Sequence, residues 1–143
     1  MNDERHWFVG VDWASEVHQV RLSDALGRKV GERSFAHGGE GLAGLAHWIL
    51  RLTDAPPDDI HVAIEVPHGP VVESLMERGF HVYAINPKQL DRFRDRFSPA
   101  GAKDDSRDAW VLCDALRTDP RCFRALSTLD PVLVELREWS RMN

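Results

Sequence analysis

The sequence predicts an α/β fold in which one mixed, five-stranded sheet is flanked by helices. Two observations carry this prediction: three short segments rich in β-formers follow one another closely, and behind them helical segments alternate with two further short apolar runs. Strands joined by short turns pair antiparallel, whereas strands joined through helices pair parallel. A chain of 143 residues that is 43% hydrophobic and 29% charged is long enough to bury one core of this kind.

The first three strands are expected to form an antiparallel meander. They are predicted at residues 7–13, 16–24 and 30–36. Val17, Val20 and Leu22 are the apolar positions of the second strand, and a turn that contains glycine, ALGRK, precedes the third. Connections this short favour hairpins between neighbouring strands.

The spacing of apolar residues then changes from that of strands to that of helices. Leu42, Leu45, Ala46 and Ile49 recur at i, i+3, i+4 and i+7, which predicts a helix. Further along, Pro87 is placed to begin another helix. The expected elements, in order, are a helix at 39–52, a strand at 60–66, a helix at 71–79, a strand at 80–85, a helix at 86–97 and a last helix after the loop at 98–103.

The composition excludes several classes of protein. No apolar run approaches the roughly 20 residues that a membrane span requires, and the start, MNDERHW, lacks the basic and then apolar build of a signal peptide. A cytoplasmic location without a membrane partner is therefore expected. The two cysteines, Cys113 and Cys122, have no paired CxxC spacing, so we expect reduced thiols and no zinc site.

A cluster of acids stands at the start of the last predicted helix, in the stretch AKDDSRDAWVL. Asp105 and Asp108 continue the helical spacing of Ala109, Leu112 and Leu116, so they would share the helix face that packs on the core. Two ionised carboxylates on a buried edge repel each other unless a cation or protons neutralise them. This pattern indicates a metal site, although acids are also favoured in the first turn of any solvated helix.

Two more acids interrupt segments that should otherwise be buried. Asp12 lies in the apolar run FVGVDW, where Gly10 shares its face of the strand, and Glu65 lies near the end of HVAIEVP. The first two hairpins run outward and a crossover helix returns the chain, so the first and fourth strands can lie parallel and adjacent. Asp12 would then lie beside Glu65. A single acid at a strand end is often only a solvated rim residue, so the inference depends on all of these acids together.

These acids form an oxygen-rich set contributed by two strands and a helix: Asp12, Glu65, Asp105 and Asp108. Carboxylate oxygens suit hard cations, so Mg²⁺ or Mn²⁺ is the expected cofactor. Two such ions clamp the attacking and leaving oxygens of a phosphodiester during an in-line displacement. The implied chemistry is metal-assisted phosphoryl transfer on nucleic acid.

The charge distribution bears on whether nucleic acid is a partner. The net charge of -5 argues against it. However, residues 1–77 carry 6 Lys/Arg against 13 Asp/Glu, whereas residues 78–143 carry 12 against 10. Basic residues crowd on both sides of the acidic cluster, and five are candidates for phosphate contacts: Lys88, Arg92, Arg96, Lys103 and Arg107. A solvated helix face that also carries Asp91 and Asp95 is an equally open interpretation.

Three stretches resemble a known family. VDWASEVHQVRLSDALGR, GFHVYAINPKQLDRFRDRF and AKDDSRDAWVLCDAL resemble the RNase H-like, RuvC-type catalytic domain of the DEDD transposases. These enzymes form the IS-one-ten group of insertion sequences and are related to the pilin-gene invertase. The resemblance covers about residues 7–125. It implies a RuvC-like fold with the four acids named above as the catalytic, metal-binding tetrad, and Lys103 fills the lysine of the family signature.

The resemblance also implies a function and partners. It implies cleavage and transfer of DNA strands in transposition, with donor and target DNA and a structured bridge RNA as partners, and assembly into dimers or tetramers. Residues 1–125 would form the catalytic domain and residues 126–143 the start of a helical linker, while the family's C-terminal domain with a nucleophilic serine would be absent. Such a fragment is not expected to recombine DNA alone. His68, in VPHGPV, departs from the family pattern and is open as a substrate contact or a turn residue.

Three alternatives are weighed against this interpretation. A 3′-5′ exonuclease of the same fold would need an Asp-x-Glu pair on the first strand, but the sequence there is Asp12-Trp13-Ala14. An actin-like ATP-binding fold would need glycine soon after the strand aspartate, and Trp13-Ala14-Ser15 supplies none. A non-catalytic module, in which the acids are structural, is left open by the sequence.

Overall fold

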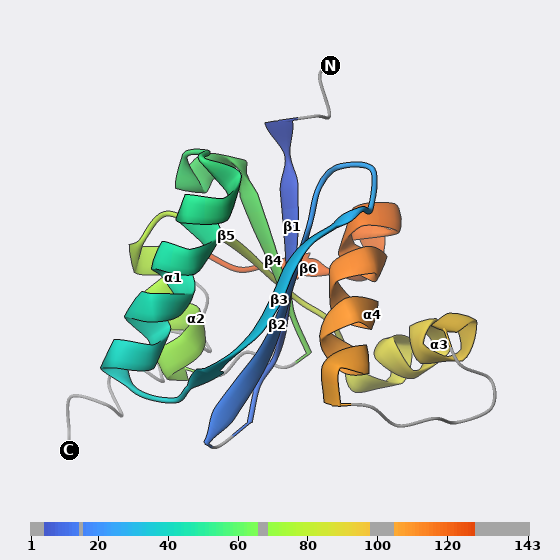
Figure 1. Cartoon of the computed structure of the whole chain (residues 1–143). Coiled ribbons are helices and arrows are strands. Elements are labelled where there is room, and N and C mark those ends of the chain that lie inside the picture. The colour runs from blue at the N-terminus through green and yellow to red at the C-terminus, as the bar shows by residue number, and fades with distance from the viewer. Residues whose placement is uncertain (1–4, 15, 66–68, 98–104, 128–143) are drawn as a thin grey trace.

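The computed structural model describes residues 5–14, 16–65, 69–97 and 105–127, which form an α/β structure around one mixed sheet. The sheet has the strand order β3-β2-β1-β4-β5-β6, so β1 and β4 lie at its centre (Figure 1). The strands are β1 (Trp7–Asp12), β2 (Val17–Ser23), β3 (Lys29–Ala36), β4 (Ile60–Ile64), β5 (His81–Ala84) and β6 (Arg124–Ala125). The predicted α/β class and mixed sheet are confirmed.

The pairing of the strands follows the predicted topology. β1, β2 and β3 form an antiparallel meander, because each pairs antiparallel with the next. The chain then returns through a helix, and β4 pairs parallel with β1 and also with β5. The carboxyl ends of β1, β4 and β5 therefore meet at one edge of the sheet.

A sixth strand is a departure from the predicted five-stranded sheet. β6 pairs antiparallel with β5, with Ala125 opposite Tyr83 and Arg124 opposite Ala84. Two residues are too few to show the alternation of apolar and polar side chains on which strand prediction rests. β6 is a strand because the edge of β5 offers it backbone hydrogen bonds, which is a tertiary effect.

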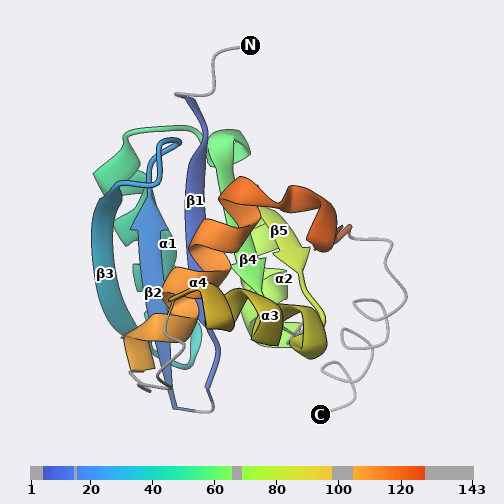
Figure 2. The ribbon, with the colours of Figure 1, turned by 90° about the vertical axis from the view of Figure 1, so that its right-hand side faces the viewer.

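Four helices cover the two faces of the sheet: α1 (Gly39–Thr53), α2 (Gly69–Glu77), α3 (Pro87–Phe97) and α4 (Asp105–Thr118). α1 and α2 lie on one face, and α3 and α4 lie on the other (Figure 1, Figure 2). Alternate residues of β1 therefore enter different cores. Val9 and Val11 pack with the α1 side, whereas Phe8 packs with the α4 side.

Two sequence-based expectations concern the ends of this architecture. The predicted linker, residues 126–143, lies almost entirely outside the part of the chain that the structure describes, since that part ends at residue 127. The proposed domain boundary at residue 125 therefore stays a prediction.

Across the described ranges, every helix is too short or too polar to cross a membrane.

α4 lies very close to the central strand β1. A Cβ atom at Gly10 would stand 2.0 Å from the carbonyl oxygen of Ala109 and 2.6 Å from the backbone nitrogen of Cys113. Glycine is the residue that permits this approach, because any side chain would overlap the helix backbone. Ala109 is fully buried at the contact. The first half of α4 is thereby held over the carboxyl end of β1.

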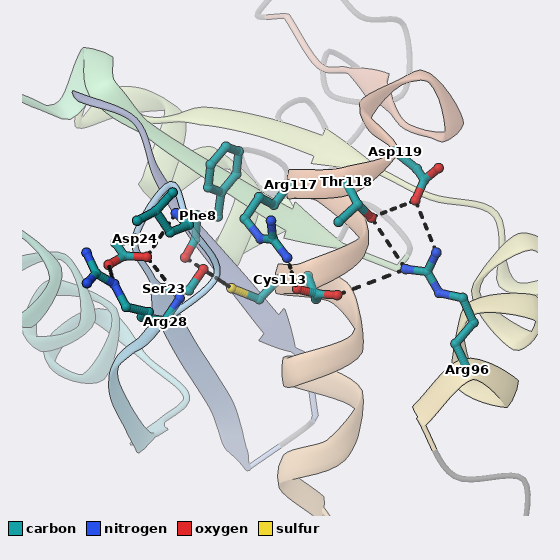
Figure 3. Close-up of polar contacts among 11 residues, drawn as sticks. Phe8, Ser23, Asp24, Arg28, Arg96, Cys113, Arg117, Thr118 and Asp119 are labelled. Atoms are coloured by element: carbon teal, nitrogen blue, oxygen red, sulfur yellow. Dashed lines mark hydrogen bonds and ion pairs between the residues drawn. The ribbon is translucent and has the colours of Figure 1, made fainter. Parts of the chain in front are cut away.

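Polar contacts of Cys113 secure the same helix against the sheet. Its Sγ atom lies 3.2 Å from the carbonyl oxygen of Phe8 and 3.2 Å from the Ser23 hydroxyl (Figure 3). Burial raises the pKa of the Cys113 thiol to about 11, so it is a neutral thiol at physiological pH. Its role is to bridge α4 to β1 and β2.

A group of aromatic and histidine side chains surrounds His61 of β4. The His61 Nε2 atom lies 3.0 Å from Nδ1 of His6, and its Nδ1 atom lies 3.2 Å from the Tyr83 hydroxyl. The ring stacks on Phe8 and on His81. Burial, together with the neighbouring His6 and His81, lowers the pKa of His61 to about 4. The packed ring is therefore neutral near pH 7.

Gly10→Ala should destabilise the protein strongly. The new methyl group would overlap the α4 backbone, which cannot move aside as a flexible side chain can, so we expect a loss of about 3 kcal/mol or more. Gly44→Ala is the matched control, since its Cβ would meet only the Phe35 ring at 3.9 Å inside α1. That change should stabilise the protein by about 0.5–1 kcal/mol. Urea unfolding of both variants measures the contrast, and equal stability would contradict the close contact.

Acid should destabilise the protein through His61. Its folded pKa, about 4, lies below the value of about 6.5 for the unfolded chain, so the unfolded state binds more protons between these values. The contribution of the neutral His61 ring to the free energy of unfolding is therefore fully present above about pH 6.5. The free energy of unfolding should fall by about 1–2 kcal/mol as the pH falls to about 4, a figure that allows for the partial exposure of the ring.

Urea unfolding at about pH 7 and about pH 4.5 measures this effect. His61→Phe should show a smaller loss of stability at the lower pH than the wild type, because phenylalanine cannot be protonated. His47→Gln, at an exposed position of α1, is the control and should behave as the wild type does. An unchanged acid response in His61→Phe would show that other groups carry it.

Candidate functional site

Two of the predicted acids lie at the carboxyl ends of the two central strands, at the same edge of the sheet. Asp12 is the last residue of β1, and Glu65 directly follows β4. The parallel register of these strands, continued by one residue, puts Asp12 opposite Glu65. Side chains alternate along a strand, so Asp12 shares the α4 face with Gly10, and Glu65 shares it with Ala63.

The third acid, Asp108, meets Glu65 at an arginine of α3. Arg94 donates from Nε to Oδ1 of Asp108 at 2.9 Å and from Nη2 to Oδ2 of Asp108 at 3.1 Å. The same Nη2 atom lies 3.3 Å from Oε2 of Glu65. The Nη1 atom pairs with Asp91, one turn earlier on α3. Two predicted site residues from different elements therefore converge on one nitrogen atom.

The guanidinium of Arg94 neutralises charge at this edge. Its hydrogen bonds with Asp108 raise the pKa of Arg94 above its already high ordinary value, against the opposing effect of burial. Arg94 is therefore charged at every physiological pH. The side chains are only partly shielded, with 23% of Arg94 and 31% of Asp108 exposed, so this is a semi-exposed ion pair. The repulsion expected among the predicted acids is relieved here by a cation of the protein itself.

Arg94 is a site residue that the sequence-based prediction omitted. The sequence does contain an indication of its role. Arg94 follows Leu90 by four residues, so the two side chains share one face of α3, and Leu90 is fully buried in the core. An arginine on that face needs an acidic partner. Which acid it meets depends on how α3 packs on α4, and no local pattern contains that information.

Three other predicted residues are only partly or not at all described. The backbone of Asp105 begins α4, but its side chain lies outside the described residues, as do all atoms of Lys103 and His68. Within the described ranges, no group of three or more His, Cys, Asp or Glu side chains is arranged to hold a metal ion. The tetrad of Asp12, Glu65, Asp105 and Asp108 thus stays a prediction, in which the structure places Glu65 beside Asp108.

The predicted phosphate-binding residues differ in their surroundings. Lys88 and Arg92 are exposed, and their side chains have no ion-pair partner among the described residues. The Nη1 atom of Arg96 instead lies 3.4 Å from Oδ2 of Asp119 (Figure 3). Its Nη2 atom lies 4.0 Å from Oδ2 of Asp114, and its guanidinium lies over the ring of Phe93. Arg96 therefore ties α3 to α4.

Arg107, in the first turn of α4, is half-buried and engaged in an interaction of its own. Phosphate binding by the five basic residues stays a prediction. For Arg96 it would require the loss of its ion pairs.

A buried histidine organises the turn that follows Asp12. His18 is fully buried, and its Nδ1 atom accepts a hydrogen bond of 3.2 Å from the backbone N–H of Ala14. The proton of the neutral ring therefore sits on Nε2, which lies 3.1 Å from Nδ1 of His37. The ring of Trp13 stacks on His18. This arrangement fixes the chain just after Asp12, and the sequence offered no periodic signal for it.

An open cleft adjoins the site on the β5 side. Its volume is about 480 Å³, and its walls include Glu65, the start of α3 at Asn86 and Pro87, and the segment from Arg121 to Arg124. Ligands of open α/β sheets bind outside the carboxyl ends of the parallel strands. Glu65 is thus reachable from a cleft that also presents arginine side chains.

The sequence is similar to one protein family and to two curated proteins. The family DEDD_Tnp_IS110, described as "Transposase", matches residues 9–143. The chain is 68% identical over 143 residues to "Putative transposase y4uE" of Sinorhizobium fredii, covering 99% of this chain and 40% of that protein. It is 35% identical over 119 residues to "Mini-circle putative transposase for IS117" of Streptomyces coelicolor, covering 83% of this chain and 29% of that protein. The chain spans less than half the length of these relatives.

The fold is similar to that of one solved structure of a complex. The structure of "T. thermophilus RuvC in complex with Holliday junction substrate" aligns with a TM-score of 0.56, at 13% identity, over 85% of this chain and 99% of that chain. At so low an identity, the likeness bears on the fold alone. The RuvC-type, RNase H-like fold expected from the sequence is confirmed.

Asp108→Asn should lower the stability of the metal-free protein by about 1 kcal/mol. The substitution removes a two-point ion pair with Arg94 that is partly exposed, and such pairs are worth about this much. Asp95→Asn is the control, since Asp95 is exposed on α3 and forms no ion pair with a described residue. Thermal melting without divalent ions measures the difference. If Asp108→Asn were more stable than the wild type, repulsion among the acids would outweigh the contribution of Arg94.

Proposed function

Because this chain belongs to the DEDD transposase family of the IS110 group, we propose that it forms the metal-dependent catalytic domain that cuts and transfers DNA strands in transposition. The observation that carries the proposal is the meeting of Glu65 and Asp108 at one atom of Arg94. These acids come from β4 and α4, and Asp12 stands opposite Glu65 at the end of β1. Three elements thus deliver acids to one edge of a RuvC-type sheet.

The chemistry of these side chains fits a divalent metal. Glu65 and Asp108 already direct carboxylate oxygens at one cationic group, and carboxylates are the ligands that Mg²⁺ and Mn²⁺ prefer. The residues that would hold the metal are Asp12, Glu65, Asp105 and Asp108. When bound, divalent ions supply Lewis-acid stabilisation of the attacking and leaving oxygens of a phosphodiester. Gly10 contributes by letting α4 bring Asp108 close to the sheet.

DNA is the partner that this function requires. The structural neighbour was solved as RuvC with a Holliday junction substrate, and the basic residues of α3 share that helix with Arg94, which contacts Glu65 and Asp108. Lys88 and Arg92 are exposed there, and the cleft beside Glu65 adds Arg121 and Arg124. Contacts to phosphates from such residues position DNA without reading its sequence. A structured guide RNA and assembly into dimers or tetramers belong to the same proposal, on the basis of the family resemblance.

Metal binding tests the proposed centre most directly. The purified chain should bind Mn²⁺ in calorimetric titrations. We expect Asp12→Asn, Glu65→Gln, Asp105→Asn and Asp108→Asn each to weaken this binding about tenfold or more, because each removes one anionic ligand. Asp114→Asn is the matched control, because Asp114 lies farther along α4 and pairs with Arg117. Its affinity should equal that of the wild type.

The same titrations can contradict the proposal in two ways. Absence of Mn²⁺ binding both by the folded wild-type chain and by Arg94→Gln, which lacks the guanidinium that contacts Asp108, would remove the metal centre. Equal affinities in the four variants and the control would place the binding at other residues. A measurable thermal stabilisation by Mn²⁺ in the wild type, lost in the four variants, would support the centre independently of heat signals.

A further inference from the structure

Arg94 is placed so that it competes with a divalent ion for the same carboxylates. Its Nε and Nη2 atoms contact both oxygens of Asp108, and Nη2 also reaches Glu65. Both carboxylate oxygens of Asp108 are therefore engaged by this one cation. A guanidinium and a divalent ion at one small site would also repel each other strongly.

We propose that Arg94 is a built-in counter-cation of the site, which holds Glu65 and Asp108 while no divalent ion is bound and must release them when one binds. This inference rests on the proposed function, since it takes these two acids as metal ligands. Binding of a divalent ion would then displace the Arg94 guanidinium from these carboxylates instead of filling an empty site. Arg94 thereby lowers the apparent affinity for metal.

Arg94 is not needed to hold α3 on α4. Leu90 and Phe93 of α3 are buried in the apolar cluster that includes Leu112 of α4. Arg96 adds polar contacts to Asp119 and to the Thr118 hydroxyl at the other end of α4. Because these contacts do not involve Arg94, α3 can stay in place when the guanidinium leaves Asp108.

A second partner for the released guanidinium lies on its own helix. Asp91 is one turn before Arg94, is 70% exposed and already pairs with the Nη1 atom. Arg94 can thus leave Glu65 and Asp108 by rotation of its side chain while keeping one acid. The planar fork of arginine also matches the oxygens of a phosphate. The exchange would therefore make an anion-binding group available next to the loaded site.

Calorimetric titration of the chain with Mn²⁺ tests the exchange. Arg94→Gln should bind Mn²⁺ about tenfold more tightly than the wild type, because the competing cation is gone. Arg51→Gln is the control: Arg51 lies on α1, on the other face of the sheet (Figure 1), is exposed and has no acidic partner among the described residues. Its affinity should stay within about twofold of the wild type. Arg94→Lys keeps the charge but loses the fork, and its affinity should fall between those of wild type and Arg94→Gln.

A spectroscopic measurement follows the guanidinium itself. The Nε–H of Arg94 donates to Asp108 in the metal-free structure, so its resonance in ¹⁵N-labelled protein should shift as Mg²⁺ is added. The midpoint of this shift should match the midpoint of binding. The same resonance in Asp108→Asn should already be displaced without metal. Thermal melting of each variant verifies that it is folded.

The possible outcomes separate this inference from the function on which it rests. If wild type and Arg94→Gln bind Mn²⁺ equally, or the Nε–H resonance is unchanged at saturation, the exchange is refuted and the metal centre stands. If Arg94→Lys binds as the wild type does while Arg94→Gln binds more tightly, nearby charge alone explains the effect and the exchange is also refuted. If neither wild type nor Arg94→Gln binds Mn²⁺, the metal centre itself fails, and the exchange fails with it.

Discussion

The close contact between Gly10 and the backbone of α4 sets the position of this helix on the sheet, and with it the position of Asp108. With a Cβ at this position only 2.0 Å from the Ala109 carbonyl oxygen, the helix could not lie where it does. Asp108 precedes Ala109, so the same contact sets the height of the Asp108 carboxylate above the sheet. Farther along, Leu112 and Cys113 are buried because the helix axis is this close to β1. One missing side chain thus positions a core helix and an acid together.

The acids that meet at the carboxyl ends of β1 and β4 repel one another. Parallel strands bring Asp12 and Glu65 to one edge, and α4 brings Asp108 to the same place, so like charges accumulate where solvent is partly excluded. Such an arrangement costs free energy unless a cation is present. In this structure the cation is Arg94, carried by α3. The helix that seems peripheral to the sheet is therefore part of the charge balance of the site.

Much of the fold and part of the site were predictable from particular residues. The apolar runs at β1 and β4 and the helical spacing of Leu42, Leu45 and Ile49 report burial directly, because burial of one face imposes a period on the sequence. Asp12 and Glu65 stand out because they interrupt those runs. Arg94 and β6 did not stand out in the same way: the first depends on helix–helix packing and the second on an edge that β5 provides. Contacts between distant segments leave no local period.

Local periodicity and the cost of burying charge were enough to identify strands β1 to β5, the four helices, their order and the acids that interrupt the apolar runs. Tertiary structure alone decided which groups meet. It placed His61 between His6 and Tyr83 and brought Nε2 of His18 within hydrogen-bond distance of His37. It also brought Glu65 and Asp108 to one nitrogen atom of Arg94. The difference lies in distance along the chain. Secondary-structure propensity and apolar periodicity are properties of a few consecutive residues. Ion pairs and ring contacts instead form between residues far apart in the sequence, which only the folded chain brings within a few ångströms.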